Sequence, residues 1–100
     1  MRNSFVYIVA SGKNAKLYLG VTRDILSRAW QHRNEYLAGY SKKHKCHRLV
    51  WFETHDDIRE AIRKEKQMKK WRRAWKIELI EKTNPGWRDL SGDLERGLLE

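Results

Sequence analysis

Two short apolar runs near the start of the chain predict a β-hairpin. Residues 5–10 are continuously apolar and aromatic, and residues 17–21 form a second such run after a loop rich in serine, glycine and asparagine. Runs of this kind around a short polar loop are typical of antiparallel strands. An even number of loop residues would place Tyr7 opposite Tyr18 on one sheet face, and an odd number would separate them. We expect the even loop.

The next segment predicts an amphipathic helix that runs from Thr22 to about Tyr36. Thr22 is a suitable N-cap, and Asp24 would place a carboxylate in the first turn, at the positive end of the helix dipole. Arg28 and His32, four residues apart, border the apolar stripe at helical spacing. The stripe itself consists of Ile25, Ala29 and Tyr36.

The middle of the chain predicts a surface loop and then a buried strand. Residues 37–47 lack a period and are rich in glycine, serine, lysine and histidine, which indicates a basic loop. Residues 49–52 are apolar on both faces, as a central strand covered on both sides would be.

A second amphipathic helix is predicted after Thr54, which forms a capping box with Asp57. Glu65 lies in the centre of its apolar stripe, a position where acidic residues are rare. Two interpretations stay open: Glu65 holds a divalent cation, or it pairs with a nearby cation such as Lys69. The stripe consists of Ile58, Ala61 and Ile62.

Helical character continues to about Thr83, with a break near Trp71, and ends before the Asn84-Pro85 pair because a residue that precedes proline avoids helical geometry. From Trp87 onward the pattern is weak and predicts a loose extension.

Composition narrows the class of protein. The chain has 100 residues, 40% of them hydrophobic, enough for one domain with one core. No apolar run is long enough to span a membrane, and no signal peptide is recognisable at the N-terminus. Cys46, the single cysteine, cannot form an internal disulfide. We therefore expect a reduced, cytoplasmic domain.

The charge balance favours a polyanionic partner. Lys and Arg number 22 against 13 Asp and Glu, a formal net charge of +9. Such an excess attracts nucleic acid, although it also serves solubility alone.

Four residues carry the candidate chemistry of the first half of the chain. Tyr7 and Tyr18 on one face could transfer protons, because neighbouring cations favour phenolate character; each alone is more often a packing residue. Arg28 offers a fork of donors that matches phosphate, and His32 can pass a proton near neutral pH. Alternatively, Arg28 pairs with an acidic residue and His32 is a polar boundary residue, which is the reading we favour for His32 taken alone.

Two further groups look functional, but each has a simpler interpretation. His44, Cys46 and His47 lack a second cluster of ligands, so a basic loop is a simpler account than a zinc site. Trp71 and Trp75 are spaced like a stacking platform for bases, and equally like a buried helix face. We predict core packing for both tryptophans and phosphate contacts for the basic residues between them.

Read together, these residues resemble the GIY-YIG nuclease superfamily, in particular its small stand-alone bacterial members. Residues 5–7 (Phe-Val-Tyr) are similar to the first motif, and residues 18–20 (Tyr-Leu-Gly), eleven positions on, to the second. Residues 28–32 look like the helix that carries the family's arginine and histidine. Glu65 matches its metal-binding glutamate, and residues 84–87 look like its late asparagine motif. Phe5 stands in place of the first motif's glycine, and Leu19 replaces an isoleucine.

The resemblance implies an α/β (α+β) fold, with a three-stranded antiparallel sheet flanked by helices. The nuclease domain would cover residues 1–90, with a short C-terminal extension over residues 91–100. It further implies an endonuclease that hydrolyses phosphodiester bonds of DNA, of a branched, damaged or single-stranded kind, with one Mg²⁺ or Mn²⁺ ion. The alternative is a nucleic-acid-binding module of a repair or recombination assembly with little or no turnover.

The resemblance also assigns roles to residues. A tyrosine-assisted water would attack phosphorus, the metal on Glu65 would stabilise the leaving oxygen, and Arg28 would support the charge on the phosphate. The expected catalytic residues are Tyr7, Tyr18, Arg28 and His32, and Gly20 and Asn84 support them. The expected nucleic-acid contacts are Arg23, Lys42, Lys43, Lys69, Lys70, Arg72 and Arg73.

Overall fold

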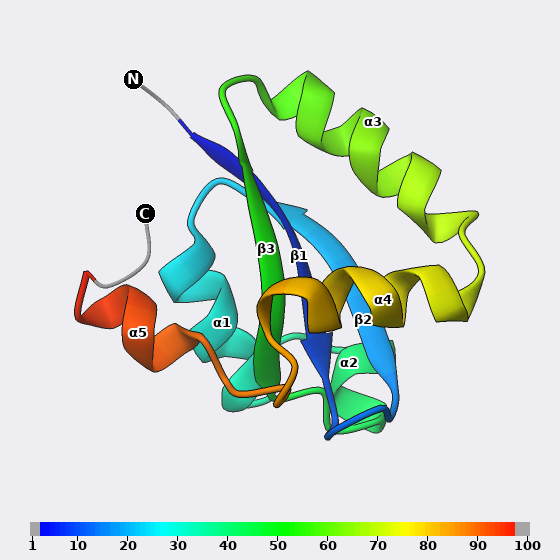
Figure 1. Ribbon diagram of the computed structural model, residues 1–100. Helices are drawn as coiled ribbons and strands as arrows, with labels where there is room; N and C mark the ends of the chain where they lie inside the picture. The colour runs from blue at the N-terminus through cyan, green and yellow to red at the C-terminus, as the bar shows by residue number, and fades with distance from the viewer. Residues whose placement is uncertain (1–2, 98–100) are drawn as a thin grey trace.

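A three-stranded antiparallel sheet forms the centre of the computed structural model, which describes residues 3–97 (Figure 1). Strand β1 (Ser4–Ala10) lies between β2 (Leu17–Thr22) and β3 (Arg48–His55). The predicted sheet is confirmed, but the expectation that residues 49–52 form its central strand is wrong. They lie in an edge strand that is apolar on both sides because helices cover both faces of the sheet.

The β1–β2 hairpin has the even loop that the sequence predicts. The Ser11 N–H donates to the Lys16 carbonyl at 3.0 Å, which encloses four loop residues. This loop is two residues longer than a direct Tyr7–Tyr18 pair requires, so that pairing is wrong. Tyr7 lies opposite Gly20, and Tyr18 lies opposite Val9. A shift of two residues preserves the face, and both tyrosines lie on the same side of the sheet.

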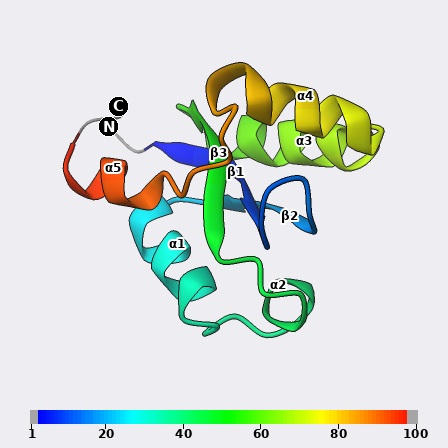
Figure 2. The same cartoon turned by 60° about the horizontal axis from the view of Figure 1, so that its bottom comes forward.

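Helices cover the sheet on both sides (Figure 2). Helices α3 and α4 lie on one side, and α1, α2 and α5 lie on the other. The helices are α1 (Ile25–Arg33), α2 (Tyr40–Lys43), α3 (Ile58–Lys69), α4 (Arg73–Thr83) and α5 (Ser91–Glu95). No helix in residues 3–97 is long and apolar enough to cross a membrane.

Alternation along β1 produces two hydrophobic clusters, one on each face of the sheet. Val6 and Ile8 point to the α3–α4 side, where they pack with Ala61, Met68 and Ile80. Tyr7 and Val9 point the other way, and their cluster contains Ile25, Ala29, Cys46, Leu49 and Leu90. The period of two that defines a strand therefore places the first motif's tyrosine on the α1 side.

Helices α1 and α3 each begin at a different residue from the one predicted. Asp24, not Thr22, is the N-cap of α1, because its carboxylate accepts the Ser27 N–H at 3.1 Å. Asp57, not Thr54, caps α3 by accepting from the Arg59 N–H at 2.9 Å. Each carboxylate reaches an N–H group that the first helical turn leaves unpaired.

Three further expectations about the helices are wrong. Helix α1 ends at Arg33, which leaves Tyr36 outside it and exposed. The predicted loop over residues 37–47 contains the short helix α2. Ile62 is exposed, and Met68, one turn beyond Glu65, is buried instead.

The α3–α4 region and the tail differ in how well the pattern predicts them. The break near Trp71 is confirmed, since α3 ends at Lys69 and α4 begins at Arg73. The prediction of a loose extension from Trp87 onward is wrong. Trp87 is fully buried, and its indole N–H donates to Glu81 at 2.7 Å. The boundary between the nuclease domain and a C-terminal extension at residue 90 stays a prediction. Residues 91–95 form helix α5, which packs against α1.

Candidate active site

A buried chain of three hydrogen-bonded side chains connects the sheet to two helices. The hydroxyl oxygen of Tyr7, on β1, lies 2.8 Å from Nε2 of His32 on α1. Nδ1 of the same imidazole lies 2.6 Å from Oγ of Ser41 on α2. All three residues are at most 3% exposed. Both ring nitrogens of His32 are therefore satisfied inside the protein, and the ring orientation is held from two sides.

Gly20 makes room for the first member of this chain. It is the cross-strand partner of Tyr7, and the phenol ring lies over its Cα. A Cβ atom at this position would lie 2.6 Å from the Tyr7 hydroxyl oxygen and 2.7 Å from Cζ. Such contacts are too short for non-bonded atoms, so any side chain here would displace the tyrosine. The supporting place expected for Gly20 thus has a steric basis.

The protonation of Tyr7 depends on the other predicted site residues. Burial raises the pKa of the Tyr7 hydroxyl well above its ordinary value, and Arg28 opposes that rise while Tyr18 and Glu65 add to it. These three side chains are therefore close enough to act on one hydroxyl. The net direction corrects the expectation of phenolate character: burial outweighs the neighbouring cation, and Tyr7 is a neutral phenol at pH 7.

His32 is held neutral in the same surroundings. It is 1% exposed, so its interpretation as a polar boundary residue is wrong. Burial, and secondarily the charge of Arg28, lowers the pKa of His32 to about 4. An uncharged imidazole at neutral pH has one nitrogen that accepts a proton, which is the state a base requires.

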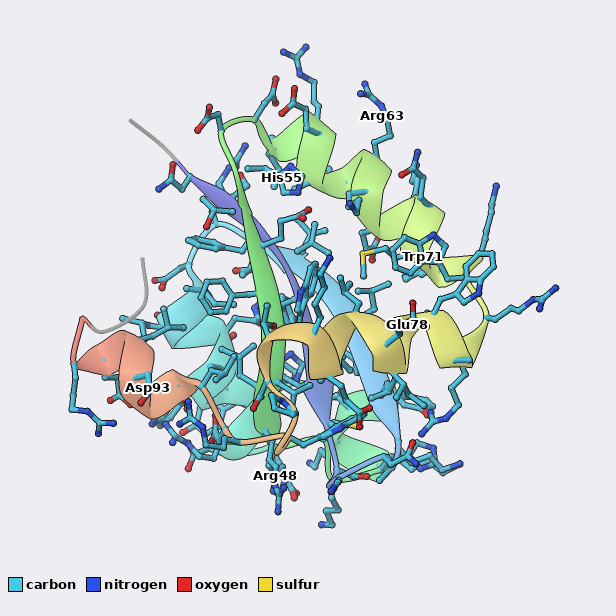
Figure 3. The ribbon with its side chains drawn as sticks, in the orientation of Figure 1. Arg48, His55, Arg63, Trp71, Glu78 and Asp93 are labelled. Atoms are coloured by element: carbon cyan, nitrogen blue, oxygen red, sulfur yellow. The ribbon has the colours of Figure 1, made fainter. Side chains whose placement is uncertain are left out.

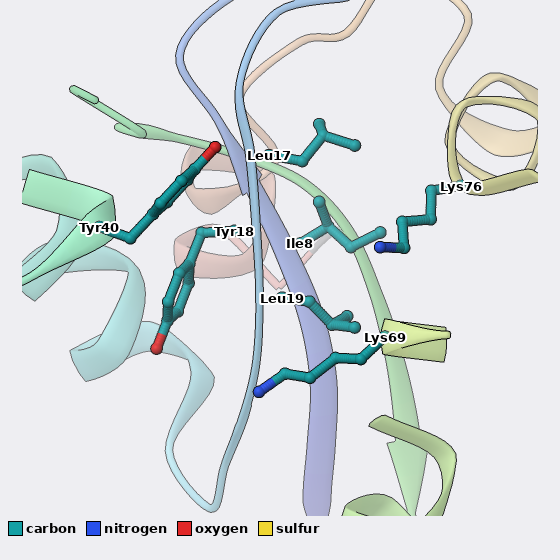
Figure 4. Close-up of a pocket in the computed structure, with 7 residues that line it drawn as sticks. All are labelled: Ile8, Leu17, Tyr18, Leu19, Tyr40, Lys69 and Lys76. Carbon is teal, nitrogen blue, oxygen red and sulfur yellow. The ribbon is translucent and has the colours of Figure 1, made fainter. Parts of the chain in front are cut away.

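An open pocket adjoins this buried chain at the edge of the sheet. Its volume is about 250 Å³, and its polar lining comes from Tyr18, Tyr40, Lys69 and Lys76. The Tyr18 ring centroid lies 5.3 Å from that of His32, and Tyr40 stacks on Tyr18 at 6.5 Å. Figure 4 shows Tyr18 and Tyr40 on one side of strand β2 and the two lysines on the other. Aromatic and cationic groups therefore meet at the rim of the site.

Glu65 has features of both interpretations left open by the sequence. Its side chain is 16% exposed, and Lys69 Nζ lies 3.1 Å from its Oε2, so the ion pair is present. Its charge also contributes to the raised pKa of the Tyr7 hydroxyl. Within residues 3–97, no three His, Cys, Asp or Glu side chains form a cluster for a metal. Any ion here would thus have one carboxylate ligand and would require oxygens from water or substrate.

Asn84 lies away from this cluster and has a structural place. Its side-chain N–H groups donate to the carbonyls of Val50 at 3.1 Å and Arg88 at 2.9 Å, and its oxygen accepts the Arg88 N–H at 3.1 Å. These bonds join the end of α4 to strand β3 and the tail. Asn84 is therefore a positioning residue for the fold around the site.

The predicted nucleic-acid contacts fall into three separate surface regions. Arg23 precedes α1, the two lysines of α2 lie beyond Tyr40, and the remaining four surround the α3–α4 turn. All seven predicted contacts are exposed: Arg23, Lys42, Lys43, Lys69, Lys70, Arg72 and Arg73. Arg73, one of the four residues around the α3–α4 turn, also has a structural contact. Its guanidinium donates to the Ala15 carbonyl in the β1–β2 loop.

The loop residues first considered for zinc have other partners. His47 lies 2.9 Å from a carboxylate oxygen of Glu35, and the His44 ring packs 4.3 Å from that of Tyr40. Cys46 is buried, and burial raises the pKa of its thiol.

Sequence reasoning missed three residues of this region: Ser41, Tyr40 and Lys76. Ser41 and Tyr40 lie in a segment without hydrophobic periodicity, so nothing in the pattern predicts helix α2. The available signal was chemical. A buried histidine needs two hydrogen-bond partners, and a sequence search for the second would have included nearby Ser and Thr side chains.

Comparison with known proteins agrees with this geometry. The GIY-YIG catalytic domain matches residues 3–78. A UPF0213 protein from Staphylococcus epidermidis is 33% identical over 81 residues, which is 81% of this chain and 98% of that protein. A UPF0213 protein from Syntrophus aciditrophicus is 36% identical over 85% of this chain and 97% of its own length.

A solved structure also shares the fold. The solution NMR structure of a UPF0213 protein from Bacillus halodurans superposes with a TM-score of 0.51 and 29% identity, over 82% of this chain and 86% of that one. The family match extends from β1 into α4 and so includes both tyrosine motifs, helix α1 and Glu65. The chain belongs to the GIY-YIG family of nuclease domains and is similar to its UPF0213 members.

Proposed function

We propose that the protein is a metal-dependent endonuclease that hydrolyses phosphodiester bonds of DNA. The buried Tyr7–His32–Ser41 chain is the observation that carries this proposal, because it couples a hydroxyl to a neutral base. Arg28 and Glu65 act on that hydroxyl, which supports their roles beside the reacting phosphate. We assign Tyr7, Tyr18, Arg28 and His32 to the reaction and Glu65 to the metal.

Proton transfer follows from the two pKa shifts. The raised pKa of Tyr7 means that the phenol does not stand ionised at neutral pH. It can accept a proton from the attacking water if it passes its own proton to Nε2 of His32 at the same time. The hydroxide so formed attacks phosphorus, the bond to the leaving oxygen breaks, and that oxygen takes a proton from solvent. His32 holds the transferred proton as an imidazolium until solvent removes it.

Ser41 orients the base in this scheme. We assign the proton to Nδ1, 2.6 Å from the Ser41 hydroxyl oxygen that would accept it, which would leave Nε2 unprotonated and directed at Tyr7. A serine hydroxyl carries no charge, unlike the carboxylate that orients histidine in many hydrolases. We therefore regard Ser41 as a positioning residue, consistent with a pKa of His32 that stays at about 4.

Arg28 and Tyr18 would bind the phosphate. The guanidinium has no carboxylate within ion-pair distance among residues 3–97, so its charge is not neutralised there and can act on phosphate oxygens. Tyr18 lines the open pocket and can donate a hydrogen bond to the same group. Positive charge at this point stabilises the additional negative charge of the transition state.

The donor set at Glu65 fits a single Mg²⁺ or Mn²⁺ ion. A lone carboxylate that acts with water and phosphate oxygens is a common arrangement for magnesium. When bound, such an ion would supply Lewis-acid stabilisation of the leaving oxygen. Lys69, the present partner of Glu65, would have to move its ammonium group to a phosphate.

The Glu65–Lys69 ion pair favours one alternative function. If Lys69 kept Glu65 neutralised, the protein would bind nucleic acid without cleaving it. Phosphate contacts would then supply binding alone.

Cleavage of a substrate panel distinguishes these functions. Single-stranded, duplex, flap and junction DNA would be incubated with Mg²⁺, Mn²⁺ or EDTA. We expect cleavage with either metal, no cleavage with EDTA, and at least a roughly 100-fold loss in Glu65→Gln with unchanged thermal unfolding. Glu60→Gln, an exposed carboxylate of the same helix, is the matched control and should cleave normally. Full activity of a well-folded Glu65→Gln variant would remove the metal role.

A further inference from the structure

Trp75 is a tryptophan that the sequence predicts for the core and the structure leaves exposed. Its side chain is 50% exposed on α4, so the expectation that it packs inside is wrong, whereas Trp71 is partly buried against the α3–α4 core. The two indoles meet edge to face at 6.3 Å. The guanidinium carbon of Arg72 lies 5.6 Å from the centroid of Trp75. An exposed indole held by two neighbours is a preordered flat surface.

A hollow of about 240 Å³ adjoins this indole. Trp71, Trp75 and Leu79 supply its apolar lining, and Glu78 and Lys82 supply one charge of each sign. Figure 3 shows Trp71 and Glu78 close together where α3 and α4 meet. Within residues 3–97, neither Glu78 nor Lys82 has an ion-pair partner or a side-chain hydrogen bond. The hollow therefore combines a flat aromatic wall with an acceptor and a donor that are open to a ligand.

The same turn carries a concentration of positive charge. Five basic residues here lack a carboxylate partner within 4.0 Å among residues 3–97: Lys66, Lys70, Arg72, Arg73 and Lys76. Burial, and secondarily the charges of Arg73 and Lys69, lowers the pKa of the Lys76 ammonium. Mutual repulsion of this kind is relieved when a polyanion binds.

We propose that the α3–α4 turn is a nucleobase-binding site, at which Trp75 stacks an unpaired base while the surrounding cations hold the adjoining phosphates. This inference rests on the proposed function, whose substrate it narrows to nucleic acid with a single-stranded segment. A flat aromatic ring stacks any base, and Arg adds to the stacking. Glu78 can accept from a base amino group, and Lys82 can donate to a base carbonyl.

Base stacking requires that the base be unpaired. Inside a duplex the faces of each base are covered by its neighbours, so Trp75 cannot reach them, and duplex DNA would offer only its phosphates to the turn. The site therefore adds affinity for single-stranded segments and none for continuous duplex.

The turn is connected to the catalytic pocket through its cations. Lys69 and Lys76 line the pocket beside Tyr18, and Lys69 pairs with Glu65. Lys76 follows Trp75 directly on α4, and Arg73 joins the helix to the β1–β2 loop. A strand held at Trp75 would thus run past Lys76 toward Tyr18, and the stacked base would lie on the same strand as the phosphate to be cleaved.

Binding measurements in EDTA test this proposal without any need for turnover. A fluorescently labelled single strand and the duplex of the same sequence would be titrated with each variant and followed by anisotropy. We expect Trp75→Ala to weaken single-strand binding roughly 10-fold or more, the range expected for loss of one stacked base. Duplex affinity should change by less than about twofold, because phosphate contacts remain. Trp75→Phe should retain most of the single-strand affinity.

Trp30→Ala is the matched control. Trp30 is 45% exposed on α1 and packs edge to face on Tyr36 at 4.8 Å, so it resembles Trp75 in exposure but lies on the other side of the sheet. Its loss should leave both affinities unchanged. The proposal is overturned if Trp75→Ala binds the single strand as Trp30→Ala does, or if its single-strand and duplex affinities fall equally. Selective loss in EDTA together with no cleavage in Mg²⁺ would support the site and contradict the proposed function.

Discussion

The buried Tyr7–His32–Ser41 chain and the exposed α3–α4 turn have opposite physical properties, and the proposed function depends on both. In the Tyr7–His32–Ser41 chain, three side chains at most 3% exposed are hydrogen-bonded in series, and burial is the largest influence on the pKa values of Tyr7 and His32. At the turn, Trp75 is half exposed and the surrounding cations face solvent. Burial changes which protonation state is stable, and exposure keeps charges ionised and accessible.

This difference separates chemistry from binding. The Tyr7–His32–Ser41 chain has a hydroxyl and a neutral base placed for proton transfer, but it has no surface on which a polymer can lie. The turn has charge and a flat ring, which suit contacts with phosphates and bases. Changes in the first region should therefore alter turnover, and changes in the second should alter affinity.

The largest effect is expected at Tyr7. Tyr7→Phe deletes one oxygen and keeps the packing of the ring over Gly20, so the fold should survive. Loss of the group that accepts the proton of water should lower single-turnover cleavage roughly 10²- to 10⁴-fold. DNA affinity in EDTA should stay within about twofold, since phosphate contacts dominate binding.

Tyr36→Phe is the control for this substitution, because Tyr36 is exposed and packs on Trp30 outside the site. It should cleave normally. Equal rates for the two variants would show that the buried hydroxyl takes no part in the reaction.

The next effect concerns stability against pH. The pKa of His32 is lowered from 6.5 to about 4 in the folded protein, so the unfolded chain binds this proton more readily. Stability is therefore full above about pH 6.5 and is lost as pH falls toward 4. At about 1.4 kcal/mol per pKa unit, the loss is about 3 kcal/mol.

Chemical denaturation between pH 7 and pH 4 measures this loss, and His32→Gln removes the group responsible. Asp24, Glu35 and Asp57 also have lowered pKa values, but both proteins contain them, so their protonation contributes equally to the two curves. The difference in free energy of unfolding between the unaltered protein and His32→Gln should therefore decrease as pH falls from 7 to 4. Parallel curves would mean that His32 is not held neutral by the fold.

A smaller effect is expected at the exposed turn. Lys70→Ala combined with Arg72→Ala should weaken DNA binding roughly 10-fold and lower the slope of log affinity against log salt by up to about 2. Cleavage at saturating DNA should be unchanged. Arg59→Ala with Arg63→Ala, two exposed positions of α3 of which Figure 3 labels Arg63, removes the same charge elsewhere. If both pairs weakened binding equally, net charge and not the turn would determine affinity.

The two regions also differ in how well the sequence predicts them. The parity of the hairpin loop follows from the alternation of residues and was predictable, so Tyr7 and Tyr18 were placed on the correct face. The register was not, because a shift of two residues leaves the apolar pattern unchanged. Asp24 and Thr22 both suit an N-cap, and only the backbone decides which carboxylate or hydroxyl reaches the free N–H groups.

Tertiary contacts explain the remaining errors. Trp71 and Trp75 have the same spacing that a buried face would show, but the helix breaks between them. Trp71 packs against the core from the α3–α4 connection, and Trp75 lies exposed on α4. Ser41 approaches His32 from nine residues away through a helix with no periodic signal. Trp87 is buried because Asn84 ties the chain to β3 after α4 ends. None of these contacts is encoded in local pattern.

The protonation of His32 tests the account most directly, because every step assigned to Tyr7 requires a neutral imidazole whose Nε2 accepts. Nitrogen chemical shifts from protein labelled with ¹⁵N-histidine report the charge and tautomer of each of the four histidines. We predict that His32 is neutral at pH 7, carries its proton on Nδ1, and titrates with a pKa near 4. Ser41→Ala should increase the Nε2–H tautomer and slow cleavage, and Ser41→Thr should restore both. A His32 that is charged at pH 7, or that carries its proton on Nε2 in the unaltered protein, would contradict the proposed proton path.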